Sequence, residues 1–265
     1  QKGRDLHYAF INYTSALVSQ RVFFNSDYHK NIFLEALPKY LDRYPDHQNK
    51  DTVTEIRAKS QTLELAMDLK ALQVPTPSAK RDKQRPTLIW NHRWEYDKNP
   101  IGFFRVIDGL LDRRVDFDLA LLGERFDKEP PYFLKAKERL GSRIVQYGHV
   151  ESFEDYAKWL WEADIAPVTS RQDFFGGSVV EALYCGCHAF LPNRLAYPAH
   201  LDEDQKAQYL YEDENELIDT LATFIQSNQW KEPLRVPLKI ESYDWVESVQ
   251  TYDNELVTLS SLNQL

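Results

Sequence analysis

Short apolar segments alternate with helical patterns through the middle of this 265-residue chain. Each apolar segment is too short to be a helix and is separated from the next by a helical pattern, so the segments are predicted to be strands. Consecutive strands joined through helices need crossover connections, and such strands form a mostly parallel sheet covered on both faces. The five predicted strands cover residues 87–90, 117–122, 143–147, 165–168 and 188–191.

Local capping signals support the helices between these strands. Asn99 and Pro100 supply an N-cap and a proline at the first helical position, and Ser152–Asp155 resembles a capping box. A further helix is predicted over Gly177–Tyr184. The alternation therefore predicts an α/β chain with a Rossmann-like domain, whose ligands bind at the carboxyl ends of the strands.

The N-terminal part of the chain has the pattern of a second, partial domain. Val22–Phe24 is predicted to be a strand that leads into a helix over residues 28–41, and another short strand is expected at Thr62–Ala66. Prolines and a basic cluster then mark a linker. The predicted division is a partial N-terminal domain over 1–75, a linker over 76–86, a Rossmann-like domain over 87–245 and a C-terminal helix over 246–265.

Composition restricts the partners of the chain. No apolar run approaches the roughly 20 residues that cross a bilayer, so no membrane span is expected. The net charge of −9 makes the average surface repel phosphate backbones, and a polyanion must therefore meet a local basic patch. The densest basic segment, Lys80–Arg85, is either such a patch or a solvated linker.

The two cysteines give no sign of redox or metal chemistry. Cys185 and Cys187 flank one glycine, a spacing too tight for a CxxC redox or zinc pair, and they are expected to be small buried residues. Few cysteines and no secretory segment favour a cytoplasmic location.

Two loops that follow predicted strands carry charged residues. Asn91–Lys98, after the first strand, places Arg93 and Lys98 five residues apart, and Ser170–Gly177, after the fourth strand, leads into a helix that carries Glu181. The glycine pair that ends the second loop lets backbone amides approach a phosphate or a sugar at a helix start. Cations for a departing diphosphate, a carboxylate for a ribose diol and a polar cradle for a sugar are what a nucleotide-sugar transferase needs. Each signal is weak by itself, and only the ordered set favours this chemistry.

These residues resemble the retaining GT-B glycosyltransferases of family 4. In that family a lysine follows an arginine by five positions, as Lys98 follows Arg93, although His92 stands where the family has glycine. The Glu-x7-Glu signature of the family corresponds to Asp173 and Glu181, with aspartate in place of the first glutamate. Two turns at strand ends also agree: Leu121–Glu124, which holds Gly123, and Tyr147–Val150, which holds Gly148 and His149.

A narrower resemblance is to the tRNA-queuosine alpha-mannosyltransferase family. It rests on the block His92–Lys98, similar to His-Arg-Trp-Glu-x-Asp-Lys, and on the block Phe174–Cys187, similar to Phe-Phe-Gly…Glu-Ala-x-Tyr-Cys-Gly-Cys. Shorter identities lie at Phe24–Ser26, Pro45–His47 and Tyr197–Pro198. The family begins with a glycine-bearing strand-loop and a Phe-His-Glu-Asn segment that do not occur here, so much of the acceptor-side domain is expected to be missing from this sequence.

The resemblance implies a donor site for a nucleotide sugar. Arg93 and Lys98 would hold the diphosphate and stabilise it as the leaving group, and Glu181 would accept hydrogen bonds from the ribose hydroxyls. Asp173 would contact the hexose, or would simply be an acid that favours the helix dipole. His92 is either a donor-site group or a histidine satisfied by a backbone carbonyl. The complete predicted set has Arg93, Lys98 and Asp173 as catalytic residues and His92, Arg93, Lys98, Gly123, Gly148, His149, Phe174, Phe175, Gly176, Gly177 and Glu181 as donor-binding residues.

The resemblance also implies the reaction. It is retaining transfer of mannose from GDP-mannose to queuosine in tRNA, with no cofactor and no metal, because the family makes two cations serve where other glycosyltransferases use a divalent ion. Two alternatives stay open. One keeps the donor and changes the acceptor to a lipid or a polysaccharide, and the other is a nucleotide-sugar-binding module without turnover.

Overall fold

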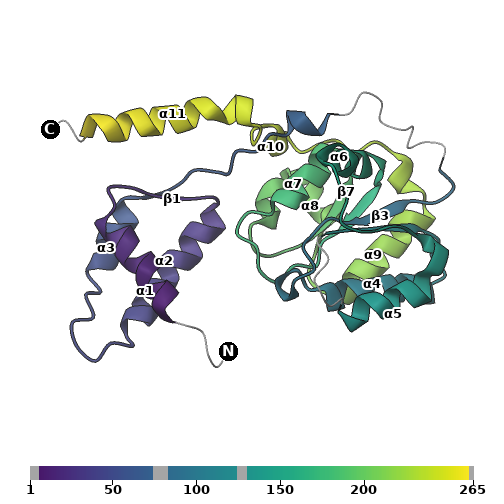
Figure 1. The fold of residues 1–265 in the computed structure, drawn as a ribbon, viewed down its shortest axis with the longest axis horizontal. Helices are drawn as coiled ribbons and strands as arrows, with labels where there is room; N and C mark the ends of the chain where they lie inside the picture. Colours follow the sequence, from purple (N-terminus) through teal and green to yellow (C-terminus); the bar gives the residue numbers. More distant parts are fainter. Residues whose placement is uncertain (1–5, 74–82, 124–129, 263–265) are drawn as a thin grey trace. The chain divides into compact units, whose positions relative to one another are not determined.

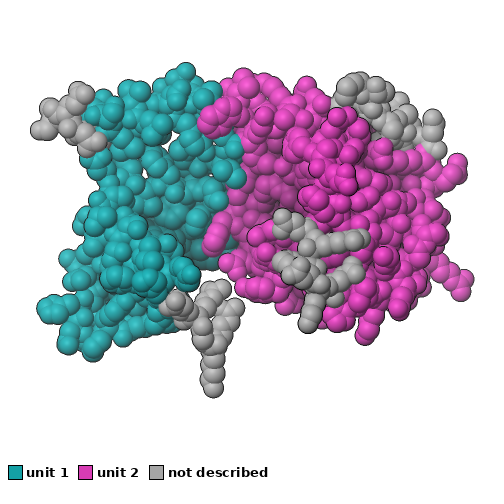
Figure 2. Space-filling view, viewed as in Figure 1, with its two compact units in different colours: residues 1–66, 248–265 teal, residues 67–247 magenta. Residues whose placement is uncertain are grey.

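The chain forms two compact units in the computed structural model, which describes residues 6–73, 83–123 and 130–262. The smaller unit consists of residues 1–66 and 248–265, and the larger unit consists of residues 67–247 (Figure 1; Figure 2). Among the described residues, none of the helices combines the length and the apolar character that crossing a bilayer requires.

The boundary between the units follows residue 66, whereas the sequence predicts it at residue 75. Met67 donates its backbone N–H to the carbonyl of Tyr243 at 2.8 Å and accepts from the N–H of Trp245 at 2.7 Å. Leu69 and Leu72 are fully buried in the core of the larger unit. These contacts attach the segment after residue 66 to the larger unit. Residues 76–82 of the predicted linker lie outside the described residues.

The larger unit is built on a six-stranded sheet in the order β5-β4-β3-β6-β7-β8, in which all strand pairs are parallel. This confirms the predicted α/β fold with a parallel sheet. The last strand was not predicted, because two residues are too few to produce a pattern. The strands are β3 Thr87–Trp90, β4 Asp118–Leu122, β5 Ile144–Gly148, β6 Ile165–Pro167, β7 His188–Pro192 and β8 Leu210–Tyr211.

Helices cover both faces of this sheet, as apolar strands such as the fully buried β3 require (Figure 1). One face carries α4 Pro100–Asp112, α5 Pro131–Leu140 and α9 Glu214–Gln226, and the other carries α6 Phe153–Glu162, α7 Gly177–Tyr184 and α8 Glu203–Tyr209. Short helical segments complete the unit: η1 Lys70–Leu72, η3 Tyr96–Lys98, η4 Gly141–Arg143, η5 Tyr197–His200, η6 Gln229–Lys231 and α10 Leu238–Glu241.

The capping residues read from the sequence begin their helices as predicted. Asn99 adopts a left-handed conformation, and its side chain accepts from the N–H of Gly102 at 3.2 Å, at the start of α4. Ser152 accepts from the N–H of Asp155 at 3.0 Å, at the start of α6. Each cap satisfies an N–H that would otherwise lack an intrahelical partner.

The smaller unit contains two short parallel strands and four helices among its described residues. β1 pairs with β2 from Val22 with Ser60 to Phe24 with Thr62. The strand predicted at 62–66 therefore begins two residues earlier, and beyond it the N–H of Ala66 donates to the hydroxyl of Tyr252 at 3.3 Å instead of to a neighbouring strand. The elements are α1 Leu6–Val18, β1 Val22–Phe24, α2 Asp27–Leu41, α3 Thr52–Ala58, β2 Ser60–Thr62 and α11 Trp245–Leu262, the last beginning in the larger unit.

Candidate functional site

The middle of the large sheet is where its strand order reverses. β3 and β6 are neighbours there, and the chain leaves them toward opposite edges of the sheet. Ligands of open α/β sheets bind at such a point, outside the carboxyl ends of the strands. The loops after β3 and β6 are joined there, because the N–H of Arg171 donates to the carbonyl of Asp97 at 2.8 Å and the hydroxyl of Thr169 donates to the carbonyl of Lys98 at 3.2 Å. The two loops that the sequence singled out are therefore adjacent.

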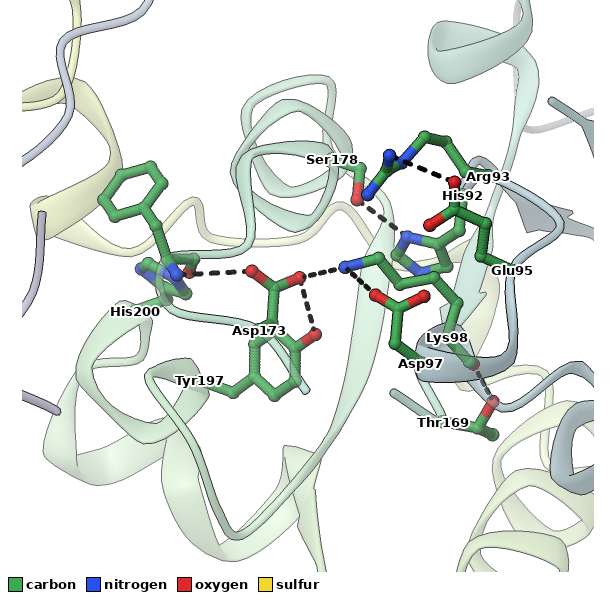
Figure 3. Close-up of polar contacts among 11 residues, drawn as sticks. His92, Arg93, Glu95, Asp97, Lys98, Thr169, Asp173, Ser178, Tyr197 and His200 are labelled. Atoms are coloured by element: carbon green, nitrogen blue, oxygen red, sulfur yellow. Dashed lines mark hydrogen bonds and ion pairs between the residues drawn. The ribbon is translucent and has the colours of Figure 1, made fainter. Parts of the chain in front are cut away.

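An ion pair links these loops. Lys98 Nζ lies 2.8 Å from Asp173 Oδ2, and the two side chains are only 13% and 14% exposed (Figure 3). Asp173 also accepts from the hydroxyl of Tyr197 and from the N–H of Phe175, both at 3.2 Å. Burial alone would raise the pKa of Asp173, but Lys98 and the Phe175 amide outweigh it and hold the pKa below its ordinary value. Asp173 is therefore a fixed carboxylate at neutral pH.

A second carboxylate lies beside the same lysine. Asp97 Oδ2 is 3.7 Å from Lys98 Nζ, and its side chain is also largely buried. Figure 3 shows the lysine ammonium between the two acids. The cation is thus held in one orientation at the joined loops, and its charge is more than balanced by its neighbours.

His92 is buried behind this pair. Its Nδ1 lies 2.8 Å from Ser178 Oγ on α7, and its side chain packs edge-on against Trp90. Burial, assisted by the nearby cation of Lys98, lowers the pKa of His92 to about 3. The histidine is therefore neutral at physiological pH, and its partner is a side-chain hydroxyl instead of the backbone carbonyl considered above.

The neutral state of His92 predicts a pH dependence of stability. The unfolded histidine binds a proton near pH 6.5 and the folded one only near pH 3, so the unfolded state holds more protons in between. In this window each unit of falling pH is expected to cost up to about 1.4 kcal/mol through this residue. Replacing His92 with Gln should make the melting temperature less sensitive to pH between 4 and 6.5. Equal slopes for the variant and the parent would contradict the assignment.

Arg93 lies apart from the buried pair. Its side chain is 62% exposed and pairs with Glu95 at 3.1 Å. A solvent-exposed pair of this kind contributes little to stability. Of the two predicted cations, Arg93 is therefore the one whose side chain can turn toward a ligand with little loss of stability.

Glu181 projects from α7 and is held by a tyrosine. The hydroxyl of Tyr156 donates to Glu181 Oε2 at 2.5 Å, and Asn91 Nδ2 lies 3.3 Å from the same hydroxyl. Asn91 also donates to the carbonyl of Ser178 at 2.8 Å. Burial raises the pKa of Glu181 above its ordinary value, and the hydrogen bond from Tyr156 offsets this only in part. The carboxylate is thus positioned by two neighbouring elements.

A cavity of about 390 Å³ opens beside these residues, at the carboxyl ends of β3, β4 and β5. Pockets for small ligands have volumes of roughly 300–1,000 Å³. Of the predicted donor residues, four line it: His92, Arg93, Gly123 and His149. The cavity wall does not include Lys98, Asp173 or Glu181. Tyr156 does line the cavity, and its hydroxyl connects the wall to Glu181.

The predicted glycines have backbone or packing roles. Gly123 has a φ of 135°, and a Cβ there would lie 2.5 Å from the carbonyl oxygen of His92. Gly148 and Gly176 both have a φ of 94°. Gly176 caps α7, where a Cβ would lie 2.8 Å from the ring of Tyr197. Only glycine fits these conformations at no cost.

The remaining predicted residues lie around the start of α7. Phe175 is 4% exposed and packs edge-on against His200 and Tyr243, and its amide is already bound to Asp173. Its side chain belongs to the core, so a donor could meet this segment mainly through backbone. Phe174 is partly buried, and Gly177 begins α7, where an added Cβ would lie 3.5 Å from the side chain of Met67.

Four residues of the site carried no predicted role. Tyr156, Ser178 and Tyr197 bind Glu181, His92 and Asp173, respectively, and His200 donates to the carbonyl of Phe175 at 2.6 Å. Only the Tyr197–Pro198 pair had been noted, as a family identity. Hydroxyl partners such as these occur throughout any sequence, and only the folded chain brings them to their carboxylates.

Comparison with known proteins agrees with this arrangement. Residues 85–227 match the family model "Glycosyl transferases group 1", and residues 1–67 match "tRNA-queuosine alpha-mannosyltransferase N-terminal". A relative, the tRNA-queuosine alpha-mannosyltransferase of Drosophila melanogaster, is 34% identical over 229 residues, which are 84% of this chain. The chain belongs to the tRNA-queuosine alpha-mannosyltransferase family of group 1 glycosyl transferases. It spans 59% of the length of that relative. The resemblance stated from the sequence is confirmed.

Solved structures share the fold at low sequence identity. Sucrose-phosphate synthase from Thermosynechococcus elongatus matches with a TM-score of 0.74 and 15% identity, over 98% of this chain and 64% of that one. The pneumococcal O-GlcNAc transferase GtfA, solved with UDP and GlcNAc, matches with a TM-score of 0.66 and 13% identity, over 95% and 47% of the two chains. Both likenesses support the predicted Rossmann-like GT-B fold.

The described residues offer little to a metal ion. In the described ranges, no group of three or more His, Cys, Asp or Glu side chains gathers where it could hold one. The expectation of a metal-independent reaction stays a prediction. Cys185 and Cys187 are both fully buried, as expected, and Cys187 donates to the carbonyl of Leu160 at 3.1 Å.

Proposed function

We propose that this chain is the donor-binding part of an enzyme that transfers mannose, with retention, from GDP-mannose to queuosine in tRNA. The observation that carries the proposal is the joining of the two predicted loops through the pair of Lys98 and Asp173, beside a cavity of ligand size. The name of the Drosophila relative supports the sugar and the acceptor.

The cations suit a diphosphate leaving group. Lys98 is fixed at the joined loops, and Arg93 is exposed at the wall of the cavity. Charge-assisted hydrogen bonds from such groups stabilise the negative charge that develops as the sugar departs. Positive charge supplied by side chains would thereby do what a divalent ion does in metal-dependent transferases.

The carboxylates suit the two sugars of the donor. Glu181 is the acceptor proposed for the ribose hydroxyls, and the hydroxyl of Tyr156 orients it. Asp173 is the group proposed for the hexose, held in place by Lys98 and Tyr197. The aspartate reaches one methylene less far than the glutamate of family 4, so the contact with the hexose differs from that of other members.

Calorimetry of the full-length protein with GDP tests the donor site. Arg93→Ala and Glu181→Ala are each expected to weaken GDP binding by about tenfold or more, because each removes a charged hydrogen-bonding group. Arg113→Ala serves as the matched control, since that arginine pairs with Asp219 at the far end of α4. Unchanged GDP affinity in both site variants would defeat the donor-site assignment.

Binding of tRNA tests the acceptor. Gel-shift titrations of the full-length protein with queuosine-containing and queuosine-lacking tRNA should show tighter binding of the former. Mass spectrometry of the tRNA after incubation with GDP-mannose should find one added hexose on queuosine. A protein that shows no preference and adds no hexose to tRNA would have another acceptor, such as a lipid or a polysaccharide, or none.

A further inference from the structure

A second cavity lies on the other side of the joined loops. It has a volume of about 480 Å³ and is lined by residues at the carboxyl ends of β6, β7 and β8 and at the starts of α4 and α9. Three of its lining residues are arginines: Arg105 on α4, Arg171 after β6 and Arg194 after β7. This cavity is separate from the one lined by Arg93 and His149, and the proposed donor site makes no use of it.

The acids of this cavity are already engaged. Glu214 pairs with Arg105 at 3.1 Å. Asp213 caps α9, accepting from the N–H groups of Asn215 and Glu216 at 2.8 and 3.0 Å. Glu214 is thus neutralised by Arg105, whereas Asp213 keeps its charge, so the arginines of the lining outnumber its acids by one.

Two of the arginines have no acidic partner. Among the described residues, no salt bridge joins Arg171 or Arg194 to a carboxylate, and the guanidinium of Arg194 donates to the carbonyl of Ser170 at 3.3 Å and to the hydroxyl of Tyr211. Both arginines are exposed to solvent. In a chain with a net charge of −9, two uncompensated arginines on one cavity wall form the local basic patch that a polyanion requires.

The cavity is connected to the proposed donor site through one loop. Arg171 lies two residues before Asp173, and its N–H donates to the carbonyl of Asp97. Thr169, on the cavity wall, donates to the carbonyls of Lys98 and Asn99, each at 3.2 Å. A ligand bound by Arg171 would therefore lie next to the loop that also carries Asp173.

We propose that Arg171 and Arg194 bind a backbone phosphate of the acceptor RNA. The inference rests on the proposed function, in which the acceptor is a tRNA. Guanidinium groups bind phosphate oxygens through paired hydrogen bonds, and an open cavity admits a phosphodiester with its neighbouring sugars. Such a contact orients the RNA and carries no information on its bases.

The salt dependence of tRNA binding tests this inference. In the full-length protein, Arg171→Gln combined with Arg194→Gln is expected to weaken tRNA binding roughly tenfold at physiological salt. The slope of log K against log salt concentration should become shallower by about 1, the change for one phosphate contact. The loss should be equal for queuosine-containing and queuosine-lacking tRNA, because a phosphate contact is blind to the base. GDP binding should stay unchanged. Arg113→Gln combined with Arg139→Gln, which also removes two positive charges but at the far end of α4, should leave both the affinity and the slope unchanged.

The possible outcomes separate this inference from the proposed function. If mannose is still added to queuosine by the parent protein but the double variant keeps the full salt slope, the phosphate site is wrong and the function stands. If the slope falls while no sugar is added to queuosine, the RNA contact stands and the proposed reaction fails. A double variant that loses affinity for inorganic phosphate but binds tRNA like the parent would identify a free phosphate as the ligand and would overturn the assignment to RNA.

Discussion

Alanine at position 98 is expected to lower kcat/KM of the full-length enzyme for sugar transfer by about 10²- to 10³-fold, the usual cost of losing one group that stabilises developing negative charge. Lys98 is the only buried cation at the joined loops among the described residues, and Arg93, largely exposed, is free to move. Steady-state kinetics with the proposed substrates, GDP-mannose and queuosine-containing tRNA, measure the loss. A decrease of less than tenfold would exclude Lys98 from stabilising the leaving group.

A double variant separates catalysis from stability. Lys98→Ala alone leaves Asp173 buried without its cation, which is expected to lower the free energy of unfolding by about 3 kcal/mol. Adding Asp173→Asn removes the uncompensated charge and should recover part of the stability, but no activity. If activity returned with stability, the pair would be only structural. Lys98→Arg is the conservative control, since it keeps the charge with a different geometry.

Gly123→Ala is expected to lower the free energy of unfolding of the larger unit by about 3 kcal/mol. Its backbone conformation, with φ at 135°, disfavours any side chain, and the new Cβ would lie 2.5 Å from the backbone oxygen of His92 and 2.8 Å from the ring of Trp94. The ring of Trp94 stacks on Phe133, with ring centroids 3.8 Å apart, so it cannot move away from the new Cβ in that direction. Calorimetric melting of the chain measures the effect.

Gly141 provides the matched control. It also has a positive φ, of 52°, but nothing lies within 4 Å of a Cβ placed there. Gly141→Ala should therefore cost only the backbone strain, and less stability than Gly123→Ala. Equal losses of stability in the two variants would show that the contact of Gly123 with His92 and Trp94 is not tight. Gly123 also lines the cavity of the proposed donor site, so its variant is expected to weaken GDP binding as well.

The charges around Lys98 bear on how a donor would bind. Asp97 and Asp173 together carry more negative charge than the lysine neutralises. A diphosphate that approaches Lys98 must therefore compete with Asp173. Tyr197 and the amide of Phe175 hold Asp173 independently of the lysine, so the carboxylate can stay in place when the cation turns to phosphate. The exposed Arg93 would supply the additional positive charge that this exchange needs.

Local sequence determined most of the larger unit. Apolar strands, proline and asparagine at a helix start, and a capping serine act through neighbours in the chain, so the positions of β3, α4 and α6 could be predicted. The same holds for the ion-pairing loops, because the carboxyl ends of parallel strands meet at one edge of a sheet. The spacing of Arg93 and Lys98 and the resemblance to a family added chemistry to that edge.

Tertiary structure decided the protonation states, the hydrogen-bond partners and the remaining boundaries, because these depend on residues far apart in the sequence. The hydroxyl that binds His92 comes from Ser178 on α7, and the hydroxyls that orient Glu181 and Asp173 come from Tyr156 and Tyr197. The two-residue strand β8 and the boundary at residue 66 likewise depend on pairing across the fold. The sequence by itself thus determined the sheet, its helices and the edge where charged residues gather. Only folding decided which of those charges are buried in pairs and which face solvent, since burial and hydrogen-bond partners are properties of the packed chain.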